Sequence, residues 1–302
     1  MLNEKNRNKV RHKPNFLIVG AAKAGTTSAA KYLNEHPDIF IPERKELRFF
    51  VRDTLLKVNQ NDPSIEKIYN SSILNEHKYF EQFQVNSKKK GEASVHYLYN
   101  YKEAIPKIKQ KLGDIHIIIF LRNPVDRAIS NIKYLHSTHK STIEDEISKE
   151  EERKKKGYNS FWFYLSLGMY SNQVQSYLNN FTKVKIILFE DFIQNPQNEL
   201  DKLYDFLDVP SYYSKYYPIH NKKLIHKKFI KNLKSSGIID LCKKLIGKSI
   251  FNRIKKKYNS KLAKEIELNP KPETVEYLKN YFKEDIQKLV KLTNIDLSKW
   301  KN

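Results

Sequence analysis

A short apolar run that ends in a small-residue loop is the strongest constraint on how this chain folds. The stretch reads PNFLIVGAAKAGTTS over residues 14–28. Residues 16–19 predict a buried strand that ends at Gly20, and the hydroxyl side chains of residues 26–28 begin a helical pattern. Such a loop turns backbone N–H groups and a helix N-terminus toward one point, which suits a phosphate or sulfate ester. The alternative is an ordinary strand-to-helix turn.

The loop differs from a nucleotide triphosphatase loop in one residue. Gly20 and Gly25 have the separation of the Walker pattern GxxxxGK[ST], but Thr26 stands where that pattern requires lysine. The loop lysine, Lys23, comes earlier. This disfavours ATP hydrolysis, whereas binding of another phosphate ester stays open.

A second apolar run predicts the architecture. Residues 114–121, DIHIIIFL, form a nearly continuous β-branched stretch of the kind buried in a parallel sheet, and Pro124 is well placed to begin the next helix. Strand, helix and strand in this order predict an α/β fold with a central parallel sheet. Ligand groups at the carboxyl ends of parallel strands share one crevice, so we expect Lys23 and Arg122 to converge.

Charge and composition limit the partners and the location. The 302 residues carry a formal charge of +22, which favours an anionic partner such as nucleic acid, an acidic membrane, a polyanionic glycan or a multiply charged cofactor. The single cysteine, Cys242, excludes an intramolecular disulfide. The polar N-terminus does not resemble a signal peptide, and no apolar run is long enough to span a bilayer. We expect a cytoplasmic protein, with attachment to a membrane surface as an option.

The positive charge concentrates near the C-terminus. Residues 221–264 contain 15 Lys and Arg and one acidic residue, a net charge of 15 − 1 = +14. Residues 237–259 have the spacing of a basic amphipathic helix. Such a helix packs on its own domain, rests on an anionic bilayer or binds a polyanionic acceptor.

Three motifs in order resemble a known family. The stretch PNFLIVGAAKAGTTS, then LNEHPDIFIPERKELRFF and later FLRNPVDRAIS resemble the sulfotransferases that use 3′-phosphoadenosine 5′-phosphosulfate (PAPS), especially the branch of the heparan sulfate enzymes and many bacterial relatives. The match runs over residues 14–208 and resumes at NIDLSKW. It implies a P-loop-like three-layer core, with the central parallel β-sheet flanked by helices. We expect a disordered basic N-terminus at residues 1–13 and a single sulfotransferase domain at residues 14–302, with a basic and amphipathic helical part at about 221–302.

The resemblance also implies the donor, the acceptor and the reaction. The donor is PAPS, no metal is needed, and the acceptor is a glycan, a glycolipid or a small molecule with a hydroxyl or amine. Nucleic acid is not an expected partner. Two alternatives remain from the residues: a kinase or nucleotidase on the same core, which ATP turnover would reveal, and a non-catalytic protein that binds polyanions or membranes, which salt-dependent DNA binding without PAPS affinity would reveal.

Donor-binding residues are carried over motif by motif. The resemblance implies that Arg122 and Ser130 bind the 3′-phosphate. The structural alternative for Arg122 is an ion pair with Asp126. Lys227 and Lys228 fall where relatives have a basic loop that closes over the adenosine phosphate. The 5′-phosphosulfate is expected on the loop residues Lys23, Ala24, Gly25, Thr26, Thr27 and Ser28, with Lys23 also stabilising charge on the bridging oxygen.

Glu46 is the candidate general base. KELRFF resembles the KExxFF element, in which the glutamate removes the acceptor's proton. Alternatively, Glu46 is a solvated loop carboxylate paired with Lys45 or Arg48. Both cations are assigned to substrate binding, and Arg48, where relatives often have histidine, is expected to keep Glu46 ionised and to lower its basicity.

Glu92 and His96 complete the candidate set. Both lie in GEASVHYLYN, which resembles the second active-site strand of the family. Glu92 is a second candidate for acid or base chemistry, or else a carboxylate that holds Lys23 or Ser94 in place. His96 either lines the acceptor pocket or is structural. The sequence has no His, Cys and Asp pattern that indicates a metal site.

Overall fold

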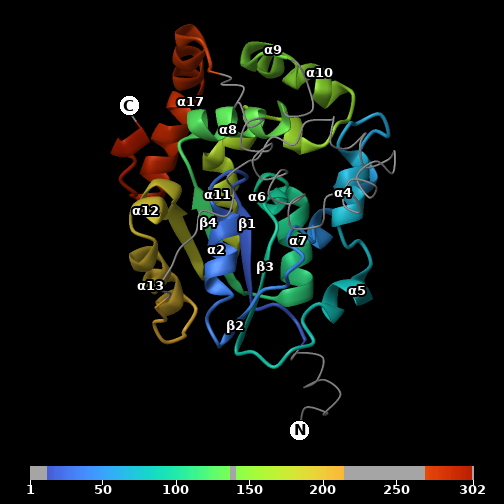
Figure 1. Cartoon of the computed structure of the whole chain (residues 1–302), viewed down its shortest axis with the longest axis vertical. Helices are drawn as coiled ribbons and strands as arrows, with labels where there is room; N and C mark the ends of the chain where they lie inside the picture. Colours follow the sequence, from blue (N-terminus) through green and yellow to red (C-terminus); the bar gives the residue numbers. More distant parts are fainter. Residues whose placement is uncertain (1–11, 137–140, 214–268, 301–302) are drawn as a thin grey trace, which may run out of the picture.

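The computed structural model describes residues 12–136, 141–213 and 269–300 (Figure 1). Lys227, Lys228 and the predicted helix at residues 237–259 lie outside these ranges, as does nearly all of the predicted disordered N-terminus.

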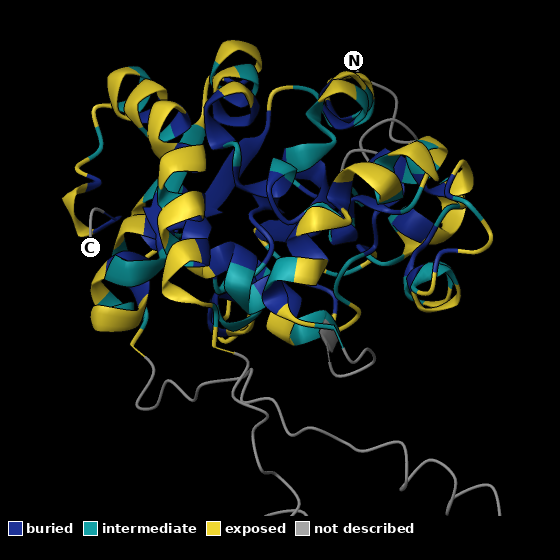
Figure 2. Cartoon of the chain, turned by 90° about the horizontal axis from the view of Figure 1, so that it is seen from above, coloured by how far each residue is buried: buried dark blue, intermediate teal, exposed yellow. Residues whose placement is uncertain are grey.

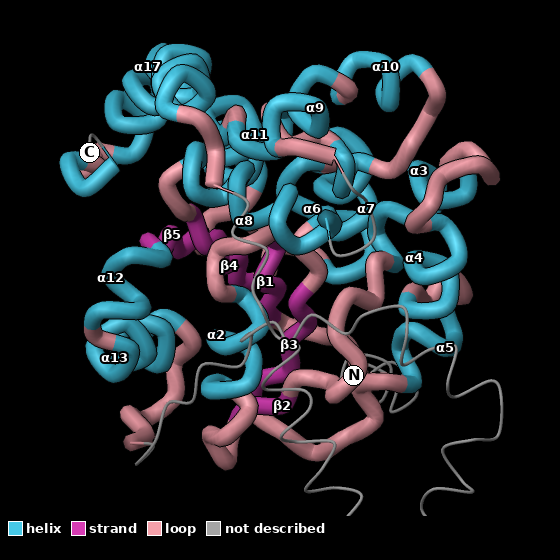
Figure 3. The backbone as a smooth tube through the Cα atoms, turned by 45° about the horizontal axis from the view of Figure 1, so that its top comes forward, coloured by secondary structure: helices cyan, strands magenta, loops and turns pink. Residues whose placement is uncertain are grey.

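A five-stranded parallel sheet forms the centre of the described fold (Figure 3). The strand order is β2-β3-β1-β4-β5, so the strand that leads into the small-residue loop is central and has a parallel neighbour on each side. Phe16 of the central strand pairs with Gly91 on one side and with His116 on the other. The strands are β1 (Phe16–Gly20), β2 (Ile39–Phe40), β3 (Lys89–Ala93), β4 (His116–Leu121) and β5 (Val184–Leu188).

Helices surround the sheet, as Figures 1 and 3 show. One group contains α2, α12 and α13, of which α2 contacts β1 and β3, while α12 and α13 contact β5. A second group contains α6, α7, α11 and α17; α6 contacts β1, and α11 lies against α6, α7 and α17. Their bounds are α2 (Thr26–Leu33), α6 (His96–Tyr99), α7 (Tyr101–Leu112), α11 (Tyr170–Asn180), α12 (Phe189–Gln194), α13 (Pro196–Phe206) and α17 (Pro272–Thr293).

Helix α8 and several short helices and 3₁₀ turns complete the described fold. Helix α8 follows β4 and contacts α9 and α17. The remaining elements are α3 (Arg52–Leu56), α4 (Ile65–Ser71), α5 (Glu76–Glu81), α8 (Pro124–His136), α9 (Ile143–Ser148), α10 (Glu150–Lys155) and the 3₁₀ turns η1 (Phe49–Val51), η2 (Ser160–Trp162), η3 (Ser166–Gly168) and η4 (Ser298–Trp300).

The three inner strands of the sheet are buried along their whole length. Every residue of β1, β3 and β4 is buried, because helices cover both faces of a parallel sheet (Figure 2). Close contact between β1 and β3 needs a glycine: a Cβ atom at Gly91 would lie 2.0 Å from the ring of Phe16. The Phe16 ring of β1 therefore rests directly on the backbone of β3 at Gly91.

The α/β class, the central parallel sheet and the flanking helices are as predicted. One element differs: the stretch around GEASVHYLYN is a strand only to Ala93, and His96 begins helix α6. Strand β2, at the edge of the sheet, consists of Ile39 and Phe40 alone. Among the described residues, no helix combines the length and the apolar character that crossing a bilayer requires.

Candidate active site

The loop after β1 adopts the conformation that its glycine predicts. Gly25 has φ of 82° and directly precedes α2, and Lys23 also has a positive φ of 70°. A side chain at position 25 would be strained by this φ, and its Cβ would lie 2.9 Å from the ring of Phe189. The loop thus places the unpaired N–H groups of the first turn of α2 near the carboxyl end of β1.

Lys23 and Arg122 converge, although 99 positions separate them. The guanidinium of Arg122 donates a hydrogen bond of 3.2 Å to the Lys23 carbonyl and lies 4.5 Å from the ring centroid of Phe189. The ammonium of Lys23 lies over the Tyr134 ring, 4.1 Å from its centroid. The carboxyl ends of β1 and β4 therefore bring the Arg122 side chain against the loop of Lys23, as expected.

Arg122 has hydrogen-bonding capacity left at this place. Its buried Nε atom has no hydrogen-bond partner among the described residues, and no ion pair with the exposed Asp126 occurs there. Ser130 lies on the same helix, α8, and is partly exposed. Arg127 is fully buried and donates to the Tyr164 carbonyl, which is a structural role.

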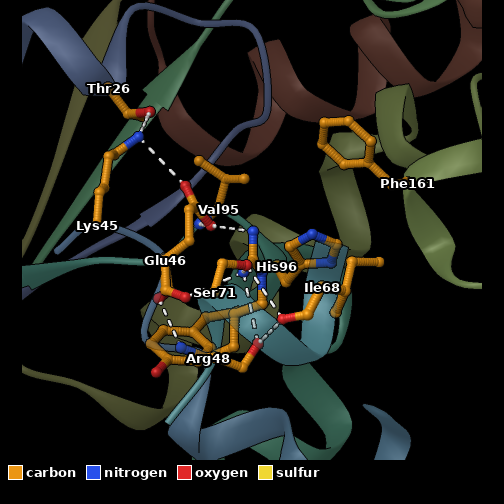
Figure 4. A network of polar contacts seen from close by, with 12 residues as sticks. Thr26, Lys45, Glu46, Arg48, Ile68, Ser71, Val95, His96 and Phe161 are labelled. Carbon is orange, nitrogen blue, oxygen red and sulfur yellow. Dashed lines mark hydrogen bonds and ion pairs between the residues drawn. The ribbon is translucent and has the colours of Figure 1, made fainter. Parts of the chain in front are cut away.

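Lys45 connects the donor loop to the candidate base (Figure 4). Its Nζ atom lies 2.9 Å from the hydroxyl oxygen of Thr26 and 3.0 Å from that of Thr27. The same atom lies 3.2 Å from Oε1 of Glu46. A single ammonium thus spans from the first turn of α2 to the Glu46 carboxylate.

Glu46 is fixed by backbone and side-chain contacts. Its φ is 65°, its N–H donates to the Ala93 carbonyl over 3.1 Å, and its Oε2 accepts a 3.1 Å hydrogen bond from the Val95 N–H. Burial by itself raises the pKa of this carboxyl, but the nearby charges of Lys45 and Arg48 lower it, and the pKa lies below its ordinary value. The carboxylate is ionised and 17% exposed, so it is not a solvated loop residue.

Arg48 contacts both Glu46 and helix α4. Its guanidinium donates to Ser71 Oγ over 2.7 Å and to the Glu46 carbonyl over 3.0 Å, and lies 3.6 Å from Oε2 of Glu46. Figure 4 shows it beside Ser71 of α4, on the far side of Glu46 from Thr26. The arginine therefore contributes charge to Glu46 while remaining attached to α4.

Glu92 is buried behind this site in a cluster of hydroxyl groups. It accepts hydrogen bonds from Tyr79 over 2.7 Å, from Tyr97 over 2.9 Å, and from Ser94, whose oxygen in turn accepts from the Arg48 N–H over 3.0 Å. Burial is the main cause that raises the pKa of Glu92 to about 7. Of the two interpretations left open, this geometry fits the carboxylate that holds Ser94. Tyr79 and Tyr97 were not among the predicted site residues.

His96 begins α6 and is buried against η2. Its Nδ1 atom lies 3.3 Å from Ser160 Oγ, and its ring stacks on the half-buried Phe161 with centroids 5.6 Å apart. Burial, followed by the charge of Arg48, lowers the pKa of His96 to about 3. The imidazole is therefore neutral at pH 7.

Metal-binding groups are not assembled in the described part of the chain: no three His, Cys, Asp or Glu side chains there are placed to share an ion. The site presents cations, hydroxyl groups and one ionised carboxylate.

Comparison with known proteins decides the family. The profile of the sulfotransferase family matches residues 14–214. This chain belongs to the sulfotransferase family. The crystal structure of a sulfotransferase from Alicyclobacillus acidocaldarius superposes with a TM-score of 0.73 and 30% sequence identity, over 96% of this chain and 99% of that one.

Curated relatives match over shorter stretches. The membrane-associated sulfotransferase kil1 of Dictyostelium discoideum is 32% identical over 123 residues, which are 40% of this chain and 23% of that protein. The mouse heparan sulfate glucosamine 3-O-sulfotransferase 3B1 is 21% identical over 201 residues, 65% of this chain and 46% of that protein. The chain thus matches between about a quarter and a half of the length of these relatives.

Proposed function

We propose that this chain transfers the sulfuryl group of PAPS to a hydroxyl or amine of an acceptor. The observation that carries the proposal is the position of Lys45, whose ammonium contacts the hydroxyls of Thr26 and Thr27 as well as the carboxylate of Glu46. A phosphosulfate at the N-terminus of α2 would therefore lie beside a base. In-line transfer needs these two groups next to one another.

The donor fits the cations of the crevice. The 5′-phosphosulfate would lie on residues 23–28, where helix N–H groups and hydroxyls are available. The 3′-phosphate would bind Arg122, whose buried Nε has a free donor, together with Ser130. Lys227 and Lys228 remain predicted contacts, because they lie outside the described residues.

The reaction follows from these positions. Glu46 accepts the proton of the acceptor hydroxyl or amine as the acceptor's oxygen or nitrogen forms a bond to sulfur. The bond between sulfur and the bridging oxygen breaks, and its electron pair stays on 3′-phosphoadenosine 5′-phosphate. Lys23 stabilises the negative charge that develops on this leaving oxygen. The leaving group departs as the bisphosphate, and the proton remains on Glu46 until solvent removes it.

The acceptor is proposed from the relatives. The mouse relative is named for heparan sulfate glucosamine 3-O-sulfation, which makes a glycan hydroxyl the first acceptor to test. The relative kil1 is named membrane-associated, and the +14 charge of residues 221–264 would favour an anionic membrane surface or a glycolipid acceptor. The location in the cytoplasm remains a prediction.

The direct experiment is a transfer assay with ³⁵S-labelled PAPS and a panel of glycans, glycolipids and small hydroxyl and amine compounds. We expect label to appear in at least one acceptor, and to appear roughly 100 times more slowly, or more slowly still, with Glu46→Gln. A parallel assay with γ-labelled ATP tests the kinase alternative. Transfer of phosphate from ATP without transfer of sulfate from PAPS would contradict the proposal.

A further inference from the structure

We propose that Lys45 couples donor binding to the base: it exchanges its contact with Glu46 for the donor phosphosulfate and so releases Glu46 to accept the acceptor's proton. The inference rests on the proposed function, because it requires PAPS at residues 23–28. It gives Lys45 a role beyond general substrate binding.

The contacts of Lys45 are fully used by protein oxygens. An ammonium has three N–H donors. In the structure three oxygens lie within hydrogen-bond distance of Nζ: Thr26 Oγ1 at 2.9 Å, Thr27 Oγ1 at 3.0 Å and Glu46 Oε1 at 3.2 Å. The lysine side chain is only 21% exposed, so water cannot easily replace any of them.

A donor anion would compete for this ammonium. The Thr26 and Thr27 hydroxyls belong to the first turn of α2, where the helix N-terminus attracts a phosphosulfate. A multiply charged anion placed there attracts Lys45 more strongly than the single charge of Glu46 does, since both lie at similar range in a partly buried site. A small rotation of the lysine side chain around the two threonines would be enough for the exchange.

The remaining charges around Glu46 do not move with the donor. Arg48 is attached to Ser71 of α4, His96 of α6 is neutral, and Glu92 lies buried behind Ser94. Burial has the largest effect and raises the pKa of Glu46, whereas nearby charges lower it, and Lys45 is the strongest of these. Withdrawal of Lys45 would leave the burial contribution in place, so the pKa of Glu46 would rise and the carboxylate would become a stronger base.

This coupling has a consequence for the order of events. Glu46 paired with Lys45 is a weak base, and it becomes effective only when the donor occupies the first turn of α2. Proton removal from the acceptor is thereby timed to the presence of the sulfuryl group.

The test is a ¹³C NMR titration of the Glu46 carboxyl carbon in glutamate-labelled full-length protein, with the signal assigned by its loss in Glu46→Gln. We expect saturation with 3′-phosphoadenosine 5′-phosphate to raise the pKa of Glu46 by about one unit or more. In Lys45→Met, the pKa should already be higher without ligand and should shift by less than half as much.

Two further variants separate the lysine from general charge effects. Arg48→Met also removes a cation beside Glu46, but this cation is attached to α4, so the ligand-induced rise should persist. Lys45→Arg should retain much of the rise, and it serves as the folded comparison if Lys45→Met is unstable. An equal rise in wild type and Lys45→Met, or no rise in wild type, would overturn the inference. Failure of the bisphosphate to bind would instead overturn the proposed function, and the inference with it.

Discussion

Glu46 is held in a backbone conformation that places its carboxylate beside the donor loop. Glu46→Gln keeps the size of the side chain and its contact with the Val95 N–H, but it removes the group that takes the acceptor's proton. We expect turnover to fall by a factor of roughly 100 or more without a loss of donor affinity, because a neutral side chain at position 46 no longer competes with the donor for Lys45. Turnover is measured with labelled PAPS and affinity by calorimetry.

The matched control is Glu92→Gln, which changes a carboxylate in the adjoining buried cluster. If Glu92→Gln abolished turnover while Glu46→Gln left it intact, the base would be Glu92, and the assignment would be wrong.

Glu92 also gives stability a pH dependence. Its ordinary pKa of 4.5 is raised to about 7 in the fold, so the folded state keeps a proton that the unfolded state has lost. This contribution to the free energy of unfolding is complete below pH 4.5 and is lost as pH rises to about 7, on the order of 3 kcal/mol in total. Urea unfolding of wild type and Glu92→Gln at a series of pH values measures the difference. A difference between the two proteins that does not change from pH 4.5 to 8 would contradict this prediction.

At the residue scale, groups at the ends of neighbouring strands were predictable, and partners that meet through loops and separate helices were not. The donor loop and its convergence with Arg122 followed from a local pattern and from the geometry of parallel strands. Lys45 was expected to bind substrate, but its contacts with both threonines depend on how the loop after β2 folds back over α2. Tyr79 was missed because it reaches Glu92 from a separate helix, α5, with no fixed spacing in the sequence.

At the scale of elements, the pairing of β1 with β3 depends on Gly91. A Cβ atom there would lie 2.0 Å from the Phe16 ring, so Gly91→Ala overpacks the sheet. We expect a loss of about 1–3 kcal/mol in the free energy of unfolding, seen as a lower urea midpoint.

Gly113→Ala is the comparison for this prediction. Gly113 has φ of 78° and ψ of −149° at the end of α7, a region that is essentially confined to glycine, whereas a Cβ atom added there would have no other atom within 4 Å. Gly113→Ala therefore shows the cost of backbone strain without overpacking, about 1–3 kcal/mol. An unchanged urea midpoint in Gly91→Ala would contradict the prediction that the Phe16 contact limits the packing of the sheet.

Elements with a single strong signal were predicted well. The apolar runs of β1 and β4 and the Pro124 start of α8 agree with the structure. The secondary structure after Ala93 was harder to predict, because the aromatic and β-branched residues there suit a buried strand as well as a buried helix. Tertiary packing against β1 decides for the helix α6.

At the scale of the whole molecule, the C-terminal turn is attached to the donor crevice. Trp300 donates from Nε1 to Glu190 over 3.1 Å, its carbonyl accepts from the Asn123 side chain over 3.2 Å, and Glu190 accepts from the Asn123 N–H over 2.9 Å. Asn123 follows Arg122 directly. The last described turn of the chain thus supports the residue proposed for the 3′-phosphate.

We therefore expect Trp300→Phe, which removes the indole N–H, to cost about 1–2 kcal/mol of stability and to weaken bisphosphate binding by roughly threefold to tenfold. Lys299→Ala is the control, because it removes only exposed contacts, an ion pair with Asp191 and a 3.4 Å hydrogen bond to Gln194, and should cost less than about 1 kcal/mol. Urea unfolding and calorimetry give both quantities. Bisphosphate binding that is the same in Trp300→Phe and wild type would remove the C-terminal turn from the support of Arg122.

The measurement that tests the central claim most directly is calorimetric titration of the protein with 3′-phosphoadenosine 5′-phosphate and, separately, with ATP, each repeated on Lys23→Ala. The account predicts tight binding of the bisphosphate, weak binding of ATP and a large loss of bisphosphate affinity in the variant. A preference for ATP, or bisphosphate binding that does not depend on Lys23, would contradict the assignment of the loop after β1 to PAPS.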